Sequence, residues 1–244
     1  MTTLTDVQYD APVADIYDAV IGAAMPTAET VERCRPHVTG RRVLDVGVGT
    51  GRIAFPLLEI AESVVGIDNS VAMLDELRAK PGAEVIETHV ADFRAGLPFA
   101  PASFGAAVST LGSLACVRSH DELEAGLRNV ATVLEPGGRF AFDYYSAATY
   151  RVLAQVGTVE VENEHHPSTT AVTTRIDEPT LTVETVVTPH DGGEATAFAE
   201  TVLLVTPDEL LAVAARAGLR PVEQQLATDY APFDWFVLER EAPR

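Results

Sequence analysis

Hydrophobic and polar positions change their periodicity twice along this chain of 244 residues. Residues 12–38 carry apolar side chains at helical spacing, interrupted near Gly22 and Pro26, and this pattern predicts two N-terminal helices. Between Arg42 and Tyr145, short continuous apolar runs alternate with longer amphipathic stretches. Continuous apolar runs are typical of strands buried on both faces, so this region predicts a parallel sheet covered by helices.

The strands and helices of this region are expected to follow one another along the chain. Strands are predicted over 42–47, 63–68, 83–93, 104–110 and 139–145, and helices over 47–61, 70–80 and 121–138. Pro56 predicts a kink or an early end in the first of these helices. Ser119 and Glu122 have the spacing of a capping box before the last helix, and Gly137-Gly138 predicts a glycine turn after it.

Residues 158–205 show a different pattern, with β-branched runs in partial alternation. Turns at 178–179 and 191–193 separate the runs and predict an antiparallel meander after the fifth strand. A helix over 207–218 and strands over 219–226 and 233–240 then follow. The predicted fold is α/β: a Rossmann-like, seven-stranded and mostly parallel sheet with helices on both faces, plus an antiparallel β insertion.

Charge restricts the partners of the chain. It has 17 Lys and Arg against 36 Asp and Glu, a formal net charge of −19. A strongly acidic protein repels phosphate backbones and anionic lipid surfaces, so we expect neither nucleic acid nor a membrane as partner. A neutral or cationic small molecule fits this charge better, although simple solubility explains it equally well.

The sequence lacks the patterns of a membrane span, a secretion signal and a metal site, and these absences predict where the protein lies and that it holds no metal. No apolar run is long enough to cross a bilayer, and the first residues lack the basic flank and apolar core of a secretion signal, so a cytoplasmic location is expected. The two cysteines, Cys34 and Cys116, are expected to be reduced thiols. Glu164 and the adjacent His165-His166 lack the spacing of metal ligands, and no metal site is predicted.

The strongest local signal is the glycine-rich loop that follows the first strand. Gly47, Gly49 and Gly51 run as G-x-G-x-G directly after Asp45. Glycines permit tight turns and let backbone amides approach a ligand. The spacing differs from the dinucleotide pattern G-x-G-x-x-G, and a carboxylate ahead of the loop suits a ligand ammonium group better than a pyrophosphate. Taken alone, a purely structural turn is the alternative.

Further polar residues stand at the ends of the next strands. Asp68 closes the second strand, where a carboxylate can accept from both hydroxyls of a ribose, while Asn69-Ser70 could serve as the helix cap. Asp92-Phe93 ends the third strand, where an acid and an aromatic ring could bracket an adenine. Residues 109–113 (STLGS) end the fourth strand, at the sheet edge where ligands of open α/β sheets bind.

These segments together resemble the class I S-adenosylmethionine-dependent methyltransferases. The matching segments are VLDVGVGTGRIAFPL, GIDNSVAML, VADF, FGAAVSTLGSL and LRNVATVLEPGGRFAFDYYS, in family order over roughly residues 42–146, and LLVTPDELLAVAARAGLRPVEQ near the end. The N-terminal helices and the β insertion are most similar to a small-molecule subgroup, the aminosugar N-methyltransferases and glycine N-methyltransferase-like enzymes. The resemblance implies S-adenosylmethionine as cofactor and S-adenosylhomocysteine as product.

The resemblance also implies roles by position. Gly47, Gly49 and Gly51 would line the methionine part of the cofactor, and Asp45 would lie near its ammonium group, directly or through a water. Asp68 and Asn69 would bind the ribose, Met73 would pack beside the adenine, and Asp92 and Phe93 would contact the adenine. Ser109, Leu111 and Gly112 would follow the methionine chain. Tyr9 and Tyr17 stand where the N-terminal lid of the subgroup contacts cofactor or substrate, with helix packing as the alternative.

Two departures from the family pattern bear on this reading. Val48 stands where Cys or Gly is common, which matters little because the loop binds through its backbone. Residues 109–114 (STLGSL) replace the N/D-P-P-Y/F motif with which enzymes that methylate amino groups of DNA and protein hold a planar nitrogen. This replacement again disfavours nucleic acid as substrate.

The resemblance to this subgroup implies a chain of three parts and an enzymatic activity. We expect the N-terminal helices and cofactor-binding core over 1–150, the inserted sheet as substrate cover or homodimer surface over 151–206, and the completing helix and strands over 207–244. The function expected is methyl transfer to nitrogen, oxygen or carbon of a small molecule. A general base is needed only where the acceptor must be deprotonated, since in-line positioning supplies much of the rate. Candidate catalytic groups are Asp143, Tyr145 and His120, with capping or packing as their alternative roles.

Three other functions are alternatives to methyl transfer. A non-methylating reaction such as cyclisation would use the charge of the same cofactor. A cofactor-bound interaction protein would transfer nothing. An NAD-dependent dehydrogenase is disfavoured, because the loop lacks the G-x-x-G end of the dinucleotide pattern.

Overall fold

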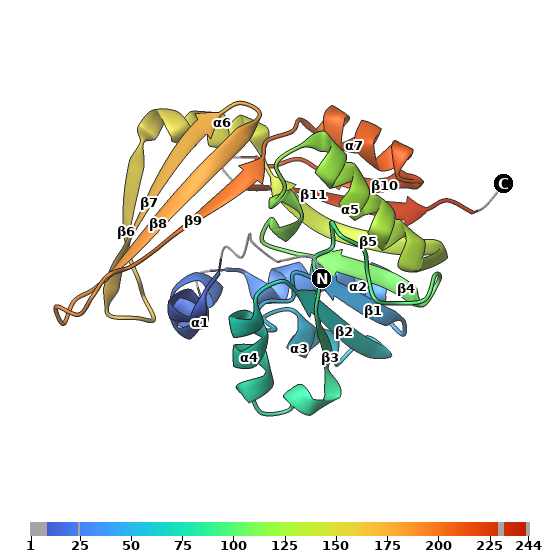
Figure 1. Cartoon of the computed structure of the whole chain (residues 1–244), viewed down its shortest axis with the longest axis horizontal. Helices are drawn as coiled ribbons and strands as arrows, with labels where there is room; N and C mark the ends of the chain where they lie inside the picture. Colours follow the sequence, from blue (N-terminus) through green and yellow to red (C-terminus); the bar gives the residue numbers. More distant parts are fainter. Residues whose placement is uncertain (1–8, 24, 229–231, 243–244) are drawn as a thin grey trace.

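A seven-stranded sheet forms the centre of the molecule, which a computed structural model describes over residues 9–23, 25–228 and 232–242 (Figure 1). Its strand order is β10-β11-β5-β4-β1-β2-β3, and only β11 runs antiparallel to its neighbours. The strands are β1 (Arg42–Val46), β2 (Ser63–Asp68), β3 (Glu87–Val90), β4 (Phe104–Ser109), β5 (Leu134–Tyr145), β10 (Leu219–Gln225) and β11 (Phe233–Arg240). The predicted Rossmann-like sheet is confirmed.

Helices cover both faces of this sheet because its strands are apolar on both sides. On one face, α5 (His120–Val133) and α7 (Pro207–Arg216) pack over side chains such as Phe140 and Phe142. On the other, α2 (Thr27–Val38), α3 (Ala54–Leu57) and α4 (Val71–Ala79) pack over side chains such as Val43 and Trp235. A capping box formed by Thr206 and Glu209 opens α7.

Several elements differ from the sequence predictions. The helix predicted over 47–61 is confined to α3, which contains Pro56. The third strand is confined to β3, because residues from Gly82, whose φ is +83°, form a 3-10 turn, η2 (Ala83–Val85), ahead of it. The helix predicted to reach Gly138 ends at Val133, since Leu134 already pairs with Phe104 of β4 and the two glycines lie at an irregularity of that pairing. Helix α6 (Ala147–Val156) was not predicted.

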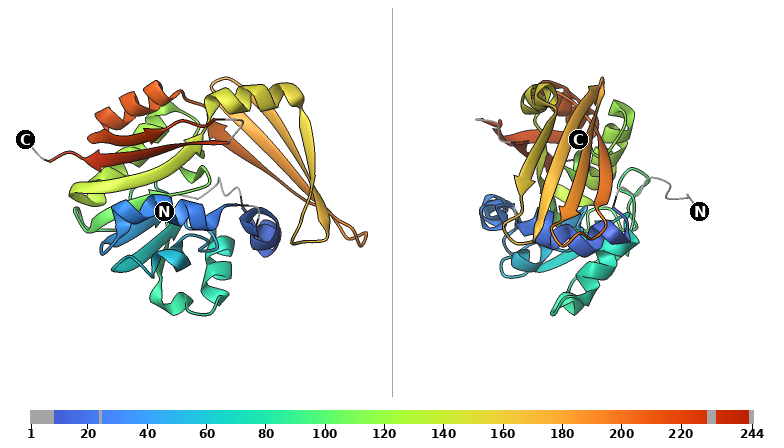
Figure 2. Two further views of the ribbon diagram at one scale, coloured as in Figure 1. Left: turned by 180° about the vertical axis from the view of Figure 1, so that it is seen from behind. Right: turned by 90° about the vertical axis from the view of Figure 1, so that its left-hand side faces the viewer.

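The inserted segment forms a four-stranded antiparallel sheet, as predicted. Its strands β6 (Thr158–Glu162), β7 (Ser168–Asp177), β8 (Thr180–Pro189) and β9 (Thr196–Leu203) pair in chain order. The sheet leans outward from the carboxyl edge of the central sheet, and α6 lies along it (Figure 2). Tyr144 of β5 joins the two sheets, since its hydroxyl donates to the Leu203 carbonyl at 2.9 Å.

The N-terminal segment lies between the inserted sheet and the central sheet (Figures 1 and 2). Helix α1 (Ala11–Tyr17) continues into a π-helical turn, η1 (Asp18–Gly22). The Asp18 carboxylate accepts from the Thr50 hydroxyl at 2.5 Å and forms an ion pair with Lys80. Lys80 in turn donates to the Thr50 carbonyl at 2.7 Å. The N-terminal segment is therefore fastened directly to the glycine-rich loop.

Candidate functional site

The glycine-rich loop takes a shape that requires glycine. Gly47, Gly49 and Gly51 have φ values of +76°, +54° and +85°, in the left-handed region. A Cβ on Gly47 would lie 2.5 Å from the Ser113 Cβ, and one on Gly51 would lie 2.8 Å from the Phe55 ring. Gly47 therefore lies too close to Ser113, and Gly51 too close to Phe55, for either position to carry a side chain. The backbone of the loop faces the space between the loop and the turn at Ser113.

Two carboxylates of the predicted set flank this loop. Asp68 accepts from the Gly49 amide at 2.9 Å and from the Ser70 amide at 2.8 Å. Asp45 is buried at 2% exposure, and burial raises its pKa to about 7, although the nearby Arg52 opposes the shift. A buried acid of this kind is complementary to a ligand cation. Asp68 therefore shapes the loop, and Asp45 offers a site for an ammonium group.

A first pocket, here called the Arg52 pocket, opens on the inner side of the loop. It is lined by Tyr17, Asp45, Gly47, Val48, Gly49, Thr50, Arg52, Ile53, Thr110, Leu111 and Ser113. Arg52 donates to the hydroxyls of Thr27 at 3.2 Å and Thr110 at 3.1 Å, which fixes its guanidinium at the wall. The pocket thus holds an acid and a base, the complement of an amino acid zwitterion. The sequence prediction missed Arg52, although it directly follows Gly51.

A second pocket, the Asp92 pocket, continues from the first past Gly47 and Ser113, which line both. It is lined by Tyr9, Gly47, Ile67, Asp68, Asn69, Ala91, Asp92, Phe93, Arg94, Ser113 and Cys116. Four residues predicted to contact ribose and adenine, namely Asp68, Asn69, Asp92 and Phe93, are therefore brought together here. The two pockets form one elongated groove along the carboxyl edge of the strands.

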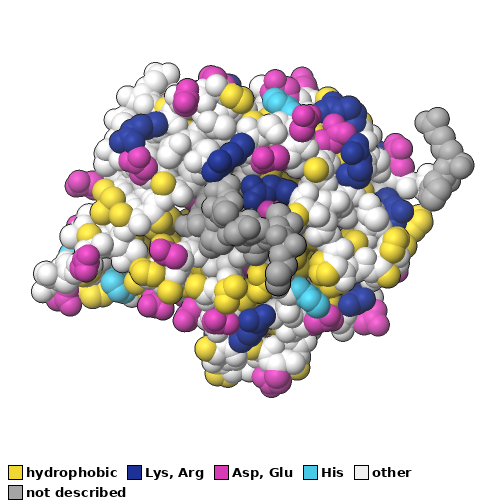
Figure 3. All heavy atoms as spheres, in the orientation of Figure 1, with side chains coloured by type: hydrophobic (Ala, Val, Ile, Leu, Met, Phe, Trp, Pro, Cys, Tyr) yellow, Lys and Arg dark blue, Asp and Glu magenta, His cyan; other side chains and the backbone are white. Residues whose placement is uncertain are grey.

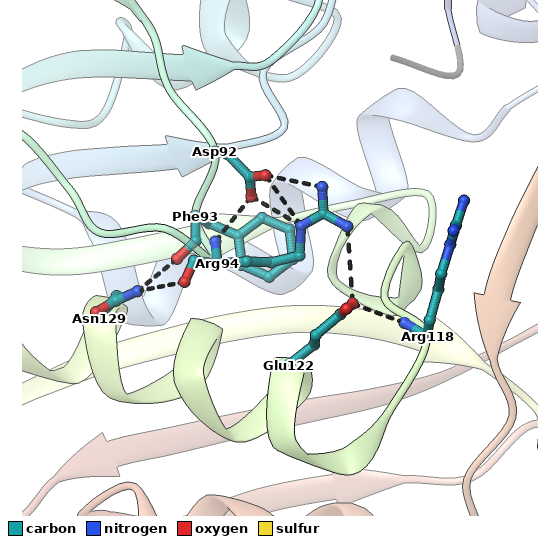
Figure 4. Close-up of polar contacts among 6 residues, drawn as sticks. All are labelled: Asp92, Phe93, Arg94, Arg118, Glu122 and Asn129. Atoms are coloured by element: carbon teal, nitrogen blue, oxygen red, sulfur yellow. Dashed lines mark hydrogen bonds and ion pairs between the residues drawn. The ribbon is translucent and has the colours of Figure 1, made fainter. Parts of the chain in front are cut away.

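Asp92 is already engaged within the chain (Figure 4). Its carboxylate accepts from the Arg94 amide at 2.9 Å and from the Arg94 guanidinium at 2.7–3.0 Å. Arg94 also lies 3.7 Å from a Glu122 oxygen, and Asn129 donates to the carbonyls of Phe93 and Arg94. Partial burial would raise the pKa of Asp92, but the Arg94 hydrogen bonds lower it below its usual value. The pocket wall is thus held by an ion pair that the sequence prediction did not include.

Asp143 holds the turn that follows β4. Its two oxygens accept from the amides of Leu111 at 2.9 Å and Gly112 at 2.6 Å. Both residues have left-handed φ values, +58° and +71°, so the turn is costly at the non-glycine Leu111. Burial raises the pKa of Asp143 to about 6, and the same two amide hydrogen bonds oppose the shift. The geometry makes Asp143 a positioning residue for the turn.

A third pocket, the tyrosine chamber, lies between the inserted sheet, the N-terminal segment and the end of β5. Its cavity volume is about 310 Å³, and its walls are largely apolar. The lining residues are Tyr9, Tyr17, Val20, Ile21, Met25, Leu111, Tyr145, Tyr150, Val161, Asn163, Thr170, Val172, Val183, Thr185, Phe198, Glu200, Pro232 and Phe233. Tyr17 and Leu111 line both this chamber and the Arg52 pocket, so the two spaces adjoin there.

Tyr145 lies in the wall of the chamber. Its ring packs against Gly112, where an added Cβ would lie 2.1 Å from a ring carbon. Its hydroxyl donates to Glu200 of β9 at 2.7 Å, and burial raises the pKa of Glu200 to about 7. Glu200 was not predicted, because it stands in a β-branched strand without a flanking motif.

The remaining predicted residues lie away from these spaces. Met73 is buried under the loop, where its Cε would lie 3.2 Å from a Cβ on Gly49. Ser109 is fully buried, and its hydroxyl donates to the Val46 carbonyl at 2.8 Å, which joins β4 to β1. His120 begins α5 and is not among the residues that line the three pockets; its charge acts on Glu209 instead.

Two findings bear on metals and membranes. Within residues 9–23, 25–228 and 232–242, no three His, Cys, Asp or Glu side chains are grouped so that they could hold a metal ion. In the same described ranges, no helix has the length and apolar character needed to span a bilayer.

Comparison with known proteins gives sequence relatives of the same kind. Residues 43–138 match a family described as a methyltransferase domain. Over 145 residues the chain is 32% identical to a cypemycin N-terminal methyltransferase from a Streptomyces species. This similarity covers 59% of the chain and 58% of the relative, so it spans little more than half of that protein's length.

Solved structures extend the likeness over nearly the whole chain. The CcbJ methyltransferase from Streptomyces caelestis is 27% identical, with a TM-score of 0.81 over 97% of this chain and 99% of that one. An amino pentose methyltransferase of calicheamicin biosynthesis from Micromonospora echinaspora, solved with S-adenosylmethionine bound, has a TM-score of 0.69. It is 19% identical over 88% of this chain and 89% of that one, a likeness of fold alone.

Proposed function

We propose that this chain is a class I S-adenosylmethionine-dependent methyltransferase and that it transfers the cofactor's methyl group to a small molecule. The observation that carries the proposal is the junction at Tyr17 and Leu111. There the pocket on the glycine-rich loop adjoins an apolar chamber roofed by the inserted sheet. A chamber of about 310 Å³ suits a small molecule, since ligand pockets typically enclose about 300–1,000 Å³.

The residues of the groove fit S-adenosylmethionine part by part. Asp45 would pair with its ammonium group and Arg52 with its carboxylate, because the two lie with opposite charge in one pocket. Asp68 would accept from the ribose hydroxyls, and Asp92 would accept from the adenine amino group beside Phe93. When bound, the cofactor supplies an electrophilic methyl group.

The chain itself would contribute positioning and exclusion of water. Asp143 holds the Leu111-Gly112 turn, so that Leu111 lies at the junction between groove and chamber. Correct orientation of donor and acceptor supplies up to roughly 7–11 kcal/mol of the barrier reduction. The apolar walls and the inserted sheet keep water from the reacting groups.

Binding measurements test the first half of this proposal. Calorimetry with S-adenosylmethionine and with NAD should show binding of the former only. Asp68→Asn removes one acceptor and should weaken that binding by at least about tenfold, as expected for a lost hydrogen bond to a charged group. Asp75→Asn is the control, because Asp75 lies on α4 and bonds only Arg78 within the described part of the chain.

Turnover tests the second half. Formation of S-adenosylhomocysteine together with a methylated small molecule would support methyl transfer. Turnover without S-adenosylhomocysteine would support cyclisation instead, and a protein that binds the cofactor but never turns over would be an interaction protein. Failure to bind S-adenosylmethionine would refute the whole proposal.

The proposal extends to partners, compartment and chain organisation. On the face drawn in Figure 3, Lys and Arg side chains lie among Asp and Glu rather than in a continuous basic surface, which supports a partner other than nucleic acid. Cys34 and Cys116 are thiols rather than a disulfide, which favours a reducing, cytoplasmic compartment. We propose natural-product tailoring as the role, the division at 150 and 206, and a homodimer through the exposed strand β6, which light scattering would test.

A further inference from the structure

The inner face of the inserted sheet carries a single carboxylate. Glu200 lies on β9 opposite Val183 of β8, and both side chains line the tyrosine chamber. Phe198, two residues earlier on the same face of β9, lines it as well. All the other residues that line the chamber are apolar, or are uncharged Tyr, Thr and Asn. A carboxylate in such surroundings is costly unless a cation or several donors accompany it.

The described part of the chain supplies little of that compensation. Tyr145 donates to Oε2 at 2.7 Å, and no other described residue donates to this carboxylate. None of the Lys, Arg or His side chains in the described ranges forms an ion pair with it, and burial alone accounts for its raised pKa of about 7. The second oxygen, Oε1, is therefore available to a group that enters the chamber from outside.

Glu200 is linked to the Leu111-Gly112 turn, which borders the Arg52 pocket. Tyr145 spans the distance between them, since its hydroxyl bonds Glu200 and its ring packs on Gly112. Gly112 follows Leu111, which lines both the chamber and the Arg52 pocket. An acceptor atom bound to Glu200 would thus lie one tyrosine ring away from the turn that borders the methyl donor.

We propose that the methyl acceptor is the amino nitrogen of an otherwise apolar small molecule, and that Glu200 binds its ammonium form and takes its proton. This inference rests on the proposed function and adds the chemical class of the substrate. The apolar walls would bind the body of the molecule, and Asn163, Thr170 and Thr185 could accept or donate a few further hydrogen bonds.

The step balances with these components. The ammonium gives one proton to the Glu200 carboxylate and becomes a neutral amine with a free electron pair. That pair forms the new N–C bond to the methyl carbon while the S–C bond breaks and its electrons go to sulfur. The nitrogen becomes positively charged as the sulfonium charge is lost, and the product leaves as a methylated ammonium. The Glu200 proton then passes to solvent.

A matched pair of probes tests this inference on the protein loaded with S-adenosylhomocysteine. The first is 4-phenylpiperidine, an apolar secondary amine, and the second is 4-phenyltetrahydropyran, in which an ether oxygen replaces the nitrogen. We expect calorimetry to show binding of the amine at least about tenfold tighter than that of the ether. Glu200→Gln should remove this preference, because the amide keeps the shape and loses the charge. Glu184→Gln should keep it, since Glu184 lies on β8 paired with Arg175 at the surface.

With S-adenosylmethionine in place of the product, mass spectrometry should detect N-methyl-4-phenylpiperidine, and Glu200→Gln should reduce its formation. The rate with wild type should rise with pH to a plateau above about 7, as Glu200 loses its proton. Glu200→Gln should lose this rise, whereas a rise caused by Asp45, whose pKa is also about 7, would remain in the variant. The other titratable groups that line the chamber are Tyr9, Tyr17, Tyr145 and Tyr150. Burial raises the pKa of Tyr17 to about 12 and those of Tyr145 and Tyr150 also, so they do not titrate in this range.

These experiments distinguish a failure of the proposed function from a failure of the amine acceptor. If S-adenosylhomocysteine fails to bind, the proposed function fails and this inference with it. If it binds, and the ether then binds as tightly as the amine, or neither binds, an amine acceptor is wrong while the proposed function stands. Unchanged amine binding by a folded Glu200→Gln protein would likewise remove Glu200 from the site. The amine–ether comparison on wild type decides the substrate class even if the variant does not fold.

Discussion

Single residues determine how closely the backbone of this site can approach its ligand. Gly47 and Gly82 share left-handed φ values, +76° and +83°, but differ in their surroundings. A Cβ on Gly47 would lie 2.5 Å from the Ser113 Cβ, whereas one on Gly82 would meet nothing within 4 Å. Substitutions at these two positions therefore separate backbone strain from steric exclusion.

Gly47→Ala should weaken S-adenosylmethionine binding by at least about tenfold, because Ser113 and the loop must move apart in the groove. Gly82→Ala should keep the affinity of wild type and lower the free energy of unfolding by about 1–2 kcal/mol, the cost of a left-handed non-glycine residue. Calorimetry and urea denaturation measure the two effects. Equal affinities of the two variants would show that the close approach at Gly47 is unimportant.

Residue identity alone does not show what each acid contacts. Asp143 was predicted as a candidate catalytic group, yet both its oxygens accept from the backbone of the Leu111-Gly112 turn. Glu200 carries no sequence motif, yet it lies in the chamber. Arg52 follows the glycine-rich loop directly, and this adjacency was the signal that could have identified it.

At the scale of elements, the N-terminal segment closes the site by docking on the glycine-rich loop. The π-helical turn η1 offers Asp18 to both Thr50 and Lys80, and π-helical turns are frequent at functional sites. Asp15, about one helical turn before Asp18, is exposed. The two aspartates lie on the same helical segment and differ in their contact with the loop.

Asp18→Ala should weaken S-adenosylmethionine binding about three- to tenfold, since the loss of one hydrogen bond and one partly exposed ion pair costs about 1 kcal/mol. Asp15→Ala should leave it unchanged. Calorimetry at low and high salt checks the assignment, because the contribution of the ion pair should shrink at high salt. Unaltered binding by Asp18→Ala at both salt concentrations would show that docking of this segment does not contribute.

Element prediction succeeded where the periodicity was strong and failed where pairing decided the boundary. Strand β2 occupies the predicted residues 63–68, because a continuous apolar run can be satisfied only inside the sheet. Leu134 joins β5 because β4 offers it a partner, and no local signal shows that. Helix α6 was not predicted. It packs against β7 of the inserted sheet, and the local sequence pattern does not show such a contact.

At the scale of the whole molecule, buried acids and a net charge of −19 both oppose folding at high pH. Burial raises the pKa values of Asp45, Asp143 and Glu200 to about 7, 6 and 7. A group whose folded-state pKa is raised is favourable to folding at low pH, and that contribution is lost as pH rises through the folded value. Stability without ligand should therefore decrease from pH 5 to pH 8.

Glu200→Gln should raise the melting temperature of the unliganded protein at pH 8 and have little effect at pH 5. The shift from an ordinary value of 4.5 to about 7 sets an upper limit of roughly 3 kcal/mol for this gain, at about 1.4 kcal/mol per pKa unit. Thermal unfolding of wild type, Glu200→Gln and the surface control Glu184→Gln at both pH values measures it. A gain of equal size at pH 5 would contradict a buried, titrating Glu200.

The sequence by itself determined the central sheet, the glycine-rich loop and the strand-end acids, because these depend on local periodicity and on residues a few positions apart. Asp68, Asn69, Asp92 and Phe93 meet in one pocket because parallel strands end at one edge. Only the tertiary structure decided the acceptor side of the site. Tyr145 and Glu200 are 55 residues apart, and the chamber they share exists only where the inserted sheet closes over the core.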